Sequence, residues 1–103
     1  MKPERTEICG RLIRFLAMDT DGLRRFILQS IVEANEVTVI SLYTMVTERF
    51  EVSQRVVASM VGYICSRLGI LHVSKASYRS PKIYSLREEY ADLARSVLSS
   101  RPS

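Results

Sequence analysis

Apolar side chains recur every three or four residues through the first third of the chain, which predicts two amphipathic helices. The first covers about residues 3–18, with its arginines mostly on the polar side. The second opens at the capping candidates Asp19, Thr20 and Asp21 and ends at Asn35. Their apolar positions are Ile8, Cys9, Leu12, Ile13, Phe15 and Leu16 in the first helix and Leu23, Phe26, Ile27, Ile31 and Ala34 in the second.

The middle of the chain predicts a short strand followed by two helices. Residues 36–40 alternate polar and β-branched side chains, which favours a strand, and Ser41 is expected to cap a third helix. The buried face of that helix is expected to consist of Leu42, Met45, Val46 and Phe50. Ser53 follows soon after and caps a fourth helix that runs to about Leu68, where Gly69 can end it. Two helices joined by so short a turn indicate a helix-turn-helix.

The fourth helix has an apolar side and a side of small or hydrogen-bonding groups. We expect Val56, Val57, Met60, Val61, Ile64 and Leu68 to be buried. The outer face would then hold Gln54, Arg55, Ser59, Gly62, Tyr63, Ser66 and Arg67. Small groups permit close approach and longer ones reach base edges or phosphates, as a helix in the major groove of DNA requires. A core helix with an ordinary polar side fits the same pattern, so this face alone leaves both open.

Beyond the fourth helix the period changes from helical to alternating, which predicts a β-hairpin. Leu71 and Val73 share a face of its first strand, and Tyr84 and Leu86 share a face of its second. The connecting loop covers about residues 75–82 and suits contact with phosphate. Its positive and hydroxyl-bearing residues are Lys75, Ser77, Tyr78, Arg79, Ser80 and Lys82.

A last helix is expected over about residues 87–100. Its apolar stripe consists of Tyr90, Leu93, Ala94, Val97 and Leu98. With the first helix it flanks the helix-turn-helix, and paired copies of such domains commonly meet through flanking helices at a two-fold DNA site. A homodimer is therefore expected.

Charge is distributed unevenly along the chain. The 15 Lys and Arg and 11 Asp and Glu give a net charge of +4. Residues 52–87 hold six of the basic residues and no acid, a local charge of +6, while the remaining residues sum to −2. Solvated faces usually mix both signs, so this segment favours a polyanionic partner over a merely solvated basic surface.

Other features restrict the class of protein. With 103 residues and no low-complexity segment, residues 1–103 are expected to form one domain. The longest nearly apolar stretch, 56–65, is far shorter than the ~20 residues of a membrane helix, and no secretory signal is evident, so we expect a cytoplasmic protein. Cys9 and Cys65 are expected to be reduced core thiols, and the single His72 lacks metal-ligand spacing and a nucleophile partner. No metal, cofactor or enzymatic activity is expected.

The order of elements and two phrases resemble the winged helix-turn-helix fold. FEVSQRVVASMVGYICSRLGIL resembles the turn, recognition helix and following strand of prokaryotic winged-helix regulators, and KIYSL resembles their second wing strand. The stretch from Val37 to Leu86 carries this likeness, and the whole chain is similar to a small archaeal winged-helix family of uncharacterised function. The resemblance implies a mainly α domain with a small β-hairpin, a core at residues 20–87, and additional N- and C-terminal helices.

This resemblance implies a transcriptional regulator that binds double-stranded DNA through a recognition helix at about 53–68 and a basic wing at about 75–82. The residues implied at the DNA are Ser53, as the helix cap, with Gln54, Arg55, Ser59, Gly62 and Tyr63 on the helix and Lys75, Tyr78, Arg79 and Lys82 on the wing. One alternative is a protein-interaction module in which Val61, Tyr63 and the wing bind an acidic protein, and another is RNA binding. Nucleic-acid binding should weaken steeply with salt, whereas an apolar protein interface should not.

Overall fold

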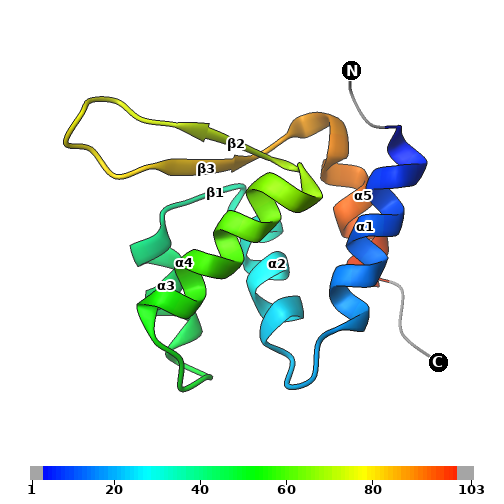
Figure 1. The fold of residues 1–103 in the computed structure, drawn as a ribbon, viewed down its shortest axis with the longest axis horizontal. Coiled ribbons are helices and arrows are strands. Elements are labelled where there is room, and N and C mark those ends of the chain that lie inside the picture. The colour runs from blue at the N-terminus through cyan, green and yellow to red at the C-terminus, as the bar shows by residue number, and fades with distance from the viewer. Residues whose placement is uncertain (1–3, 100–103) are drawn as a thin grey trace.

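The computed structural model describes residues 4–99. In chain order the elements are α1 (Arg5–Ala17), α2 (Leu23–Ala34), β1 (Glu36–Val37), α3 (Val39–Val46), α4 (Gln54–Tyr63), the π-helical turn η1 (Ile64–Leu68), β2 (Leu71–Ser74), β3 (Ile83–Leu86) and α5 (Glu88–Ser99). They form a mainly helical fold with a small antiparallel sheet, which is compatible with a winged-helix-like architecture (Figure 1).

The sheet has three strands, and β3 lies between β1 and β2. Leu71 pairs with Leu86 and Val73 pairs with Tyr84, so the predicted hairpin is confirmed. Because paired residues on adjacent strands point to the same face, these four side chains line one side of the hairpin. Leu71 and Leu86 are buried there, whereas Val73 is 38% exposed. The hairpin thus leaves the core as it extends, and its loop projects from the helical body (Figure 1).

The start of α2 is held by the acids that the sequence marked as capping candidates. The Asp19 carboxylate accepts hydrogen bonds from the backbone N–H groups of Arg24 and Arg25. Oδ1 of Asp21 accepts from the N–H of Leu23 at 3.1 Å. These bonds satisfy donors that have no partner inside the helix. The N-cap position itself is Gly22, with φ of 89°, so none of the three predicted candidates is the N-cap and the helix begins at Leu23.

Other predicted helix ends are confirmed. Ser53 caps α4, its hydroxyl accepting a hydrogen bond from the N–H of Val56. Asn35 and Gly69 end their helices in the left-handed conformation, with φ of 68° and 75°, which suits these two residue types. The fourth helix does reach Leu68, but its last turn is π-helical, a change that the periodicity did not reveal.

The strand after α2 is shorter than predicted, and the cap of α3 was assigned wrongly. β1 ends at Val37, and Thr38 caps the helix in place of Ser41. The Thr38 hydroxyl accepts from the N–H of Ser41, and the Ser41 hydroxyl accepts from the N–H of Thr38, both at 3.0 Å. This reciprocal capping box stabilises helix at Val39 and Ile40 despite their preference for strands.

The buried face of α4 differs from the prediction at Val56 and at Met60, which is only half-buried. Val57 and Val61 are fully buried, as are the following Ile64 and Leu68. Val56, predicted to be buried, is 40% exposed. Successive helical residues are rotated by about 100°, so Val56 lies beside the core-facing line rather than on it.

The buried face predicted for the third helix is confirmed at two of its four positions. Leu42 and Val46 are fully buried. Met45 and Phe50, predicted for the same face, are half-buried against the core, and Phe50 lies beyond the end of α3.

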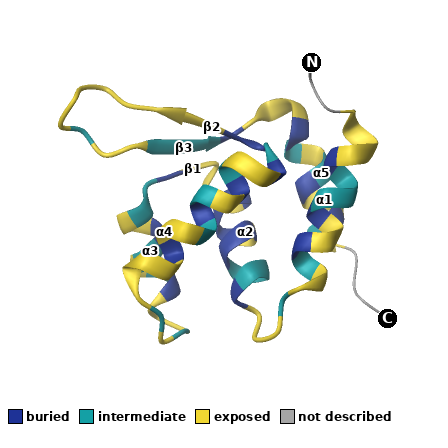
Figure 2. Cartoon of the chain, in the orientation of Figure 1, coloured by how far each residue is buried: buried dark blue, intermediate teal, exposed yellow. Residues whose placement is uncertain are grey.

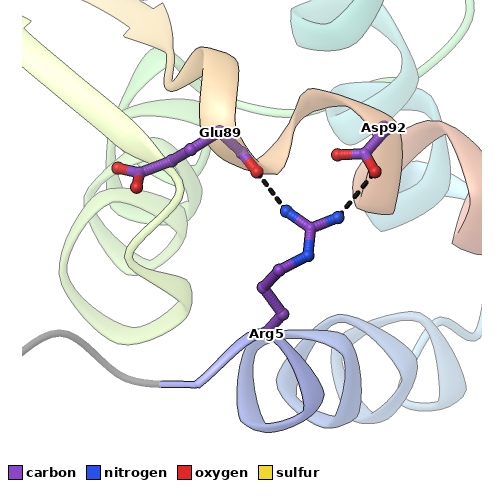
Figure 3. A network of polar contacts seen from close by, with 3 residues as sticks. All are labelled: Arg5, Glu89 and Asp92. Carbon is purple, nitrogen blue, oxygen red and sulfur yellow. Dashed lines mark hydrogen bonds and ion pairs between the residues drawn. The ribbon is translucent and has the colours of Figure 1, made fainter.

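The terminal helices pack against each other and against the rest of the core. Their buried residues are Ile8, Leu12 and Phe15 in α1 and Tyr90, Ala94 and Val97 in α5. Arg5 adds a polar link, donating to the Glu89 carbonyl and to the Asp92 carboxylate, the latter at 2.6 Å (Figure 3). One chain therefore buries most of the two stripes by itself.

Candidate nucleic-acid interface

The outer side of α4 and η1 presents a strip of small residues. Arg55, Ser59, Gly62 and Ser66 share the side opposite the buried Val57, following helical spacing. The serines and the arginine are exposed, and a Cβ added to Gly62 would meet nothing within 4 Å. The hydroxyl of Ser66 folds back to donate to the Gly62 carbonyl at 2.8 Å. The middle of the strip therefore carries only small side chains and is open to an approaching ligand. Arg55 places a positive charge at its N-terminal end.

The residues before this strip are also exposed. Gln54 lies in the first turn of α4, while Ser53 is engaged as its cap. Glu51 is exposed in the preceding turn and adds one negative charge at this end. The strip therefore begins at Arg55, and Gln54 is the polar side chain immediately before it.

Tyr63 lies on the flank of α4 rather than on the central strip. Its ring stacks on Phe15 of α1, with centroids 5.8 Å apart, and it is 38% exposed. The guanidinium of Arg24 lies 5.0 Å from the centroid of the same Phe15 ring. Phe15 thus joins a residue of the predicted recognition helix to a cation of α2.

An open cavity of about 400 Å³ lies at this flank. It is lined by Arg24, Arg55, Val56, Ser59, Met60 and Tyr63. Sequence reasoning missed Arg24, because it precedes the acid-free segment and follows Asp19 and Asp21 closely. No local signal distinguishes it, since only the packing of α2 beside α4 brings it to the cavity.

The loop between β2 and β3 presents positive charges that form no ion pair with any residue in the described range 4–99. All four predicted wing residues, Lys75, Tyr78, Arg79 and Lys82, are exposed, as the loop in Figure 2 shows. Tyr78 is 93% exposed, and the Lys75 Nζ lies 5.8 Å from its ring centroid. Within the loop, the Ser77 and Ser80 hydroxyls lie 2.8 Å apart and the Ser80 N–H donates to the Ser77 carbonyl. The serines therefore shape the turn and leave the cations outward.

The cations of residues 52–87 differ in whether their side chains are free to bind a ligand. Within residues 4–99, Arg55 and the three wing cations form no ion pair. Arg87 instead donates to the Leu71 carbonyl at the base of the hairpin. Val61, expected at a protein-docking surface in the alternative interpretation, is fully buried and cannot contribute to one.

The described part of the chain contains no group of three or more His, Cys, Asp or Glu side chains placed to hold a metal ion. His72 is exposed on β2, and Cys9 and Cys65 are free, half-buried thiols. None of the helices between residues 4 and 99 is long and apolar enough to cross a membrane.

Comparison with other proteins identifies relatives without an assigned activity. A family model described as "Protein of unknown function (DUF2551)" matches residues 12–94. An uncharacterized protein of Archaeoglobus fulgidus is 37% identical over 93 residues, covering 89% of this chain and 93% of that protein. No solved structure matches the chain significantly. The matched residues include all elements from α2 to β3, the C-terminal part of α1 and the N-terminal part of α5.

Proposed function

The chain belongs to the family described as "Protein of unknown function (DUF2551)", and we propose that it is a DNA-binding transcriptional regulator of the winged helix-turn-helix type. In this assignment α3 and α4 are the helix-turn-helix, α4 is the recognition helix, and β2 and β3 form the wing. The pairing of β1 with β3 anchors the wing to the strand between α2 and α3.

One observation carries the proposal: both elements of this arrangement hold cations that form no ion pair with an acid among residues 4–99. Arg55 lies on the exposed side of α4, and Lys75, Arg79 and Lys82 lie in the loop of the hairpin. Phosphate contacts supply most of the sequence-independent affinity for DNA, and exposed Lys and Arg free of local acids suit them. Tyr78 adds an exposed ring and hydroxyl at the same loop.

The mechanism follows from the shape of the two elements. The strip containing Ser59 and Gly62 allows α4 to approach the floor of the major groove. Gln54, Arg55 and Tyr63 then lie nearest to bases or phosphates. The wing cations contact the backbone irrespective of sequence, which fixes the position of the domain on the duplex.

We also propose that two copies bind a two-fold DNA site, although burial of the terminal stripes does not require a partner. The apolar surface left on the flanking helices centres on Ile13, which is 54% exposed. Ile13 lines an open cavity of about 460 Å³ together with Cys9 and Leu93. Pairing of copies across this surface would place two recognition helices on one duplex, as two-fold operators require.

The experiment is selection of bound duplexes from a random DNA pool, followed by salt titration of the selected duplex. We expect enrichment of a palindromic sequence and a steep linear fall of log affinity with log salt concentration. Absence of enrichment together with salt-independent or undetectable duplex binding would contradict the proposal.

A protein-interaction module is the second candidate, favoured by exposed apolar residues on the same two helices. Ile40 on α3 is 62% exposed, and Val56 on α4 is 40% exposed. A partner that buries these side chains would bind with little salt dependence, unlike DNA or RNA. The salt titration therefore separates the two functions, and competition between duplex DNA and single-stranded RNA separates DNA from RNA binding.

A further inference from the structure

We propose that the cavity beside α4 is a phosphate site in which Arg24 and Arg55 hold one backbone phosphate of the bound DNA. The inference rests on the proposed function for the source of the phosphate. It adds a residue of α2 to the interface and assigns Arg55 to the backbone rather than to a base. The cavity of about 400 Å³ has these two arginines on its lining, contributed by different helices.

Arg24 is positioned by the core rather than by an acid. Its guanidinium lies 5.0 Å from the centroid of the Phe15 ring, and Phe15 is almost completely buried. A guanidinium held on an aromatic face keeps its N–H groups available at the edge. Arg24 is thus preorganised for an anion, and ordering it costs little side-chain entropy on binding.

The acids nearest to Arg24 in the sequence accept hydrogen bonds from backbone N–H groups and form no ion pair with its guanidinium within residues 4–99. Asp19 accepts hydrogen bonds from the backbone N–H groups of Arg24 and Arg25, and Asp21 accepts from that of Leu23. Neither Arg24 nor Arg55 forms an ion pair with another residue between positions 4 and 99. The two positive charges at the cavity are therefore without a counter-charge in direct contact.

The remaining lining matches a phosphate with its sugar. Ser59 and Tyr63 carry hydroxyl groups that can donate to phosphate oxygens, and Val56 and Met60 provide apolar surface. Guanidinium groups bind phosphate through paired, charge-assisted hydrogen bonds. The volume lies within the range of small-ligand sites, so it accommodates more than the phosphate alone.

The place of the cavity connects it to the recognition helix. Arg55 and Ser59 belong both to its lining and to the exposed strip of α4. A phosphate bound there would lie immediately beside a helix inserted in the major groove, where the backbone borders that groove. Such a contact would set the depth and register of α4 without reading sequence.

The test compares Arg24→Gln, Arg55→Gln and the control Arg95→Gln in the full chain. Arg95 is an exposed arginine of α5 that lines a different surface, so its replacement removes one charge away from α4. Affinity for a selected and a random duplex is measured over a range of salt, after circular dichroism and thermal melting establish folding. Arg24→Lys keeps the charge and serves as the second variant should Arg24→Gln fail to fold.

We expect Arg24→Gln and Arg55→Gln each to weaken both duplexes similarly, by roughly three- to tenfold, and to lower the salt slope by about one unit. Arg24→Lys should retain part of the affinity, and Arg95→Gln should change it little. If the wild type binds duplex while Arg24→Gln is indistinguishable from Arg95→Gln, the phosphate site is refuted and the proposed function stands. The site is equally refuted if Arg55→Gln lowers affinity for the selected duplex only.

A second arm separates failure of the site from failure of DNA binding. Inorganic phosphate is titrated into the protein while the side-chain Nε–H signals of its arginines are followed by NMR. If no duplex binds but phosphate shifts the Arg24 and Arg55 signals of the wild type and does not shift the Arg55 signal of Arg24→Gln, the site stands with a free phosphate as its ligand. If neither duplex nor phosphate produces a response, both the site and its proposed source are overturned.

Discussion

Tyr63 of α4 stacks on Phe15 of α1, with ring centroids 5.8 Å apart and 21° between the ring planes. The N-terminal helix therefore braces the proposed recognition helix from its flank. Because Phe15 is 1% exposed and fixed in the core, it limits where the Tyr63 ring can point. Tyr63 can offer its hydroxyl and ring edge to a ligand, but one face of its ring is occupied by Phe15.

This contact predicts different outcomes for two substitutions of Tyr63. Tyr63→Ala should lower the free energy of unfolding by about 1–2 kcal/mol, because a half-exposed aromatic contact is lost. Tyr63→Phe keeps the ring and should stay within about 0.5 kcal/mol of the wild type. Both should reduce the preference for the selected over the random duplex by about 1–3 kcal/mol if the hydroxyl contacts a base. Urea unfolding and duplex binding measure the two effects, and an unchanged preference in Tyr63→Phe would exclude a base contact by the hydroxyl and leave only a contact with phosphate.

Replacement of Lys75, Arg79 or Lys82 by Ala should weaken binding to all duplexes to a similar extent. Each lost phosphate contact should lower the salt slope by about one unit. The side chains are exposed in the loop, so unfolding free energies should change little. If the triple variant binds duplex with unchanged affinity and salt dependence, the acid-free segment is not a nucleic-acid surface and the protein-interaction function replaces it.

Gly62→Ala should separate stability from DNA binding. An added Cβ meets nothing within 4 Å at either Gly62 or Gly10, so each substitution should stabilise its helix by about 0.5–1 kcal/mol. Only Gly62 lies on the exposed strip of α4, where a methyl group would hinder close approach to the groove. Gly10→Ala on α1 is the matched control for stability only, because Gly10 lines the same cavity as Ile13.

Duplex affinity should therefore be lower for Gly62→Ala than for the wild type. Urea unfolding and binding titrations give both quantities for each variant. Equal duplex affinity of Gly62→Ala and the wild type would show that α4 does not approach its ligand closely at this position.

The wild-type protein should be a dimer at micromolar concentration, and Ile13→Arg should be a folded monomer. Ile13 is 54% exposed, so a charge there is tolerated in one chain but opposes an apolar contact between copies. Light scattering gives the mass, and circular dichroism checks the fold of the variant. A monomeric wild type would contradict both the proposed pairing of copies at Ile13 and the expectation of a palindromic DNA site.

Helix ends could be predicted from the sequence where a single residue near the boundary has a strong preference for a capping position. Ser53, Asn35 and Gly69 act within a turn of their own positions, so the chain around them is enough to assign their role. The cap of α3 was misassigned because Thr38 and Ser41 both carry hydroxyls and each can cap. Their reciprocal bonding decides the boundary, and the residue pattern does not show which of the two begins the helix.

The sequence by itself determined the order of the helices, the hairpin, and the concentration of cations in residues 52–87, because periodicity, capping and charge are properties of neighbouring residues. Tertiary structure alone decided that Val56 is exposed, that Tyr63 is braced by Phe15, and that Arg24 joins Arg55 at one cavity. The contacts of Tyr63 and Arg24 depend on where α1 and α2 lie relative to α4, and the exposure of Val56 depends on which side of α4 faces the core. Contacts between residues far apart in the chain leave no periodic trace in it, because the backbone between them can follow many paths and only the packed core selects one.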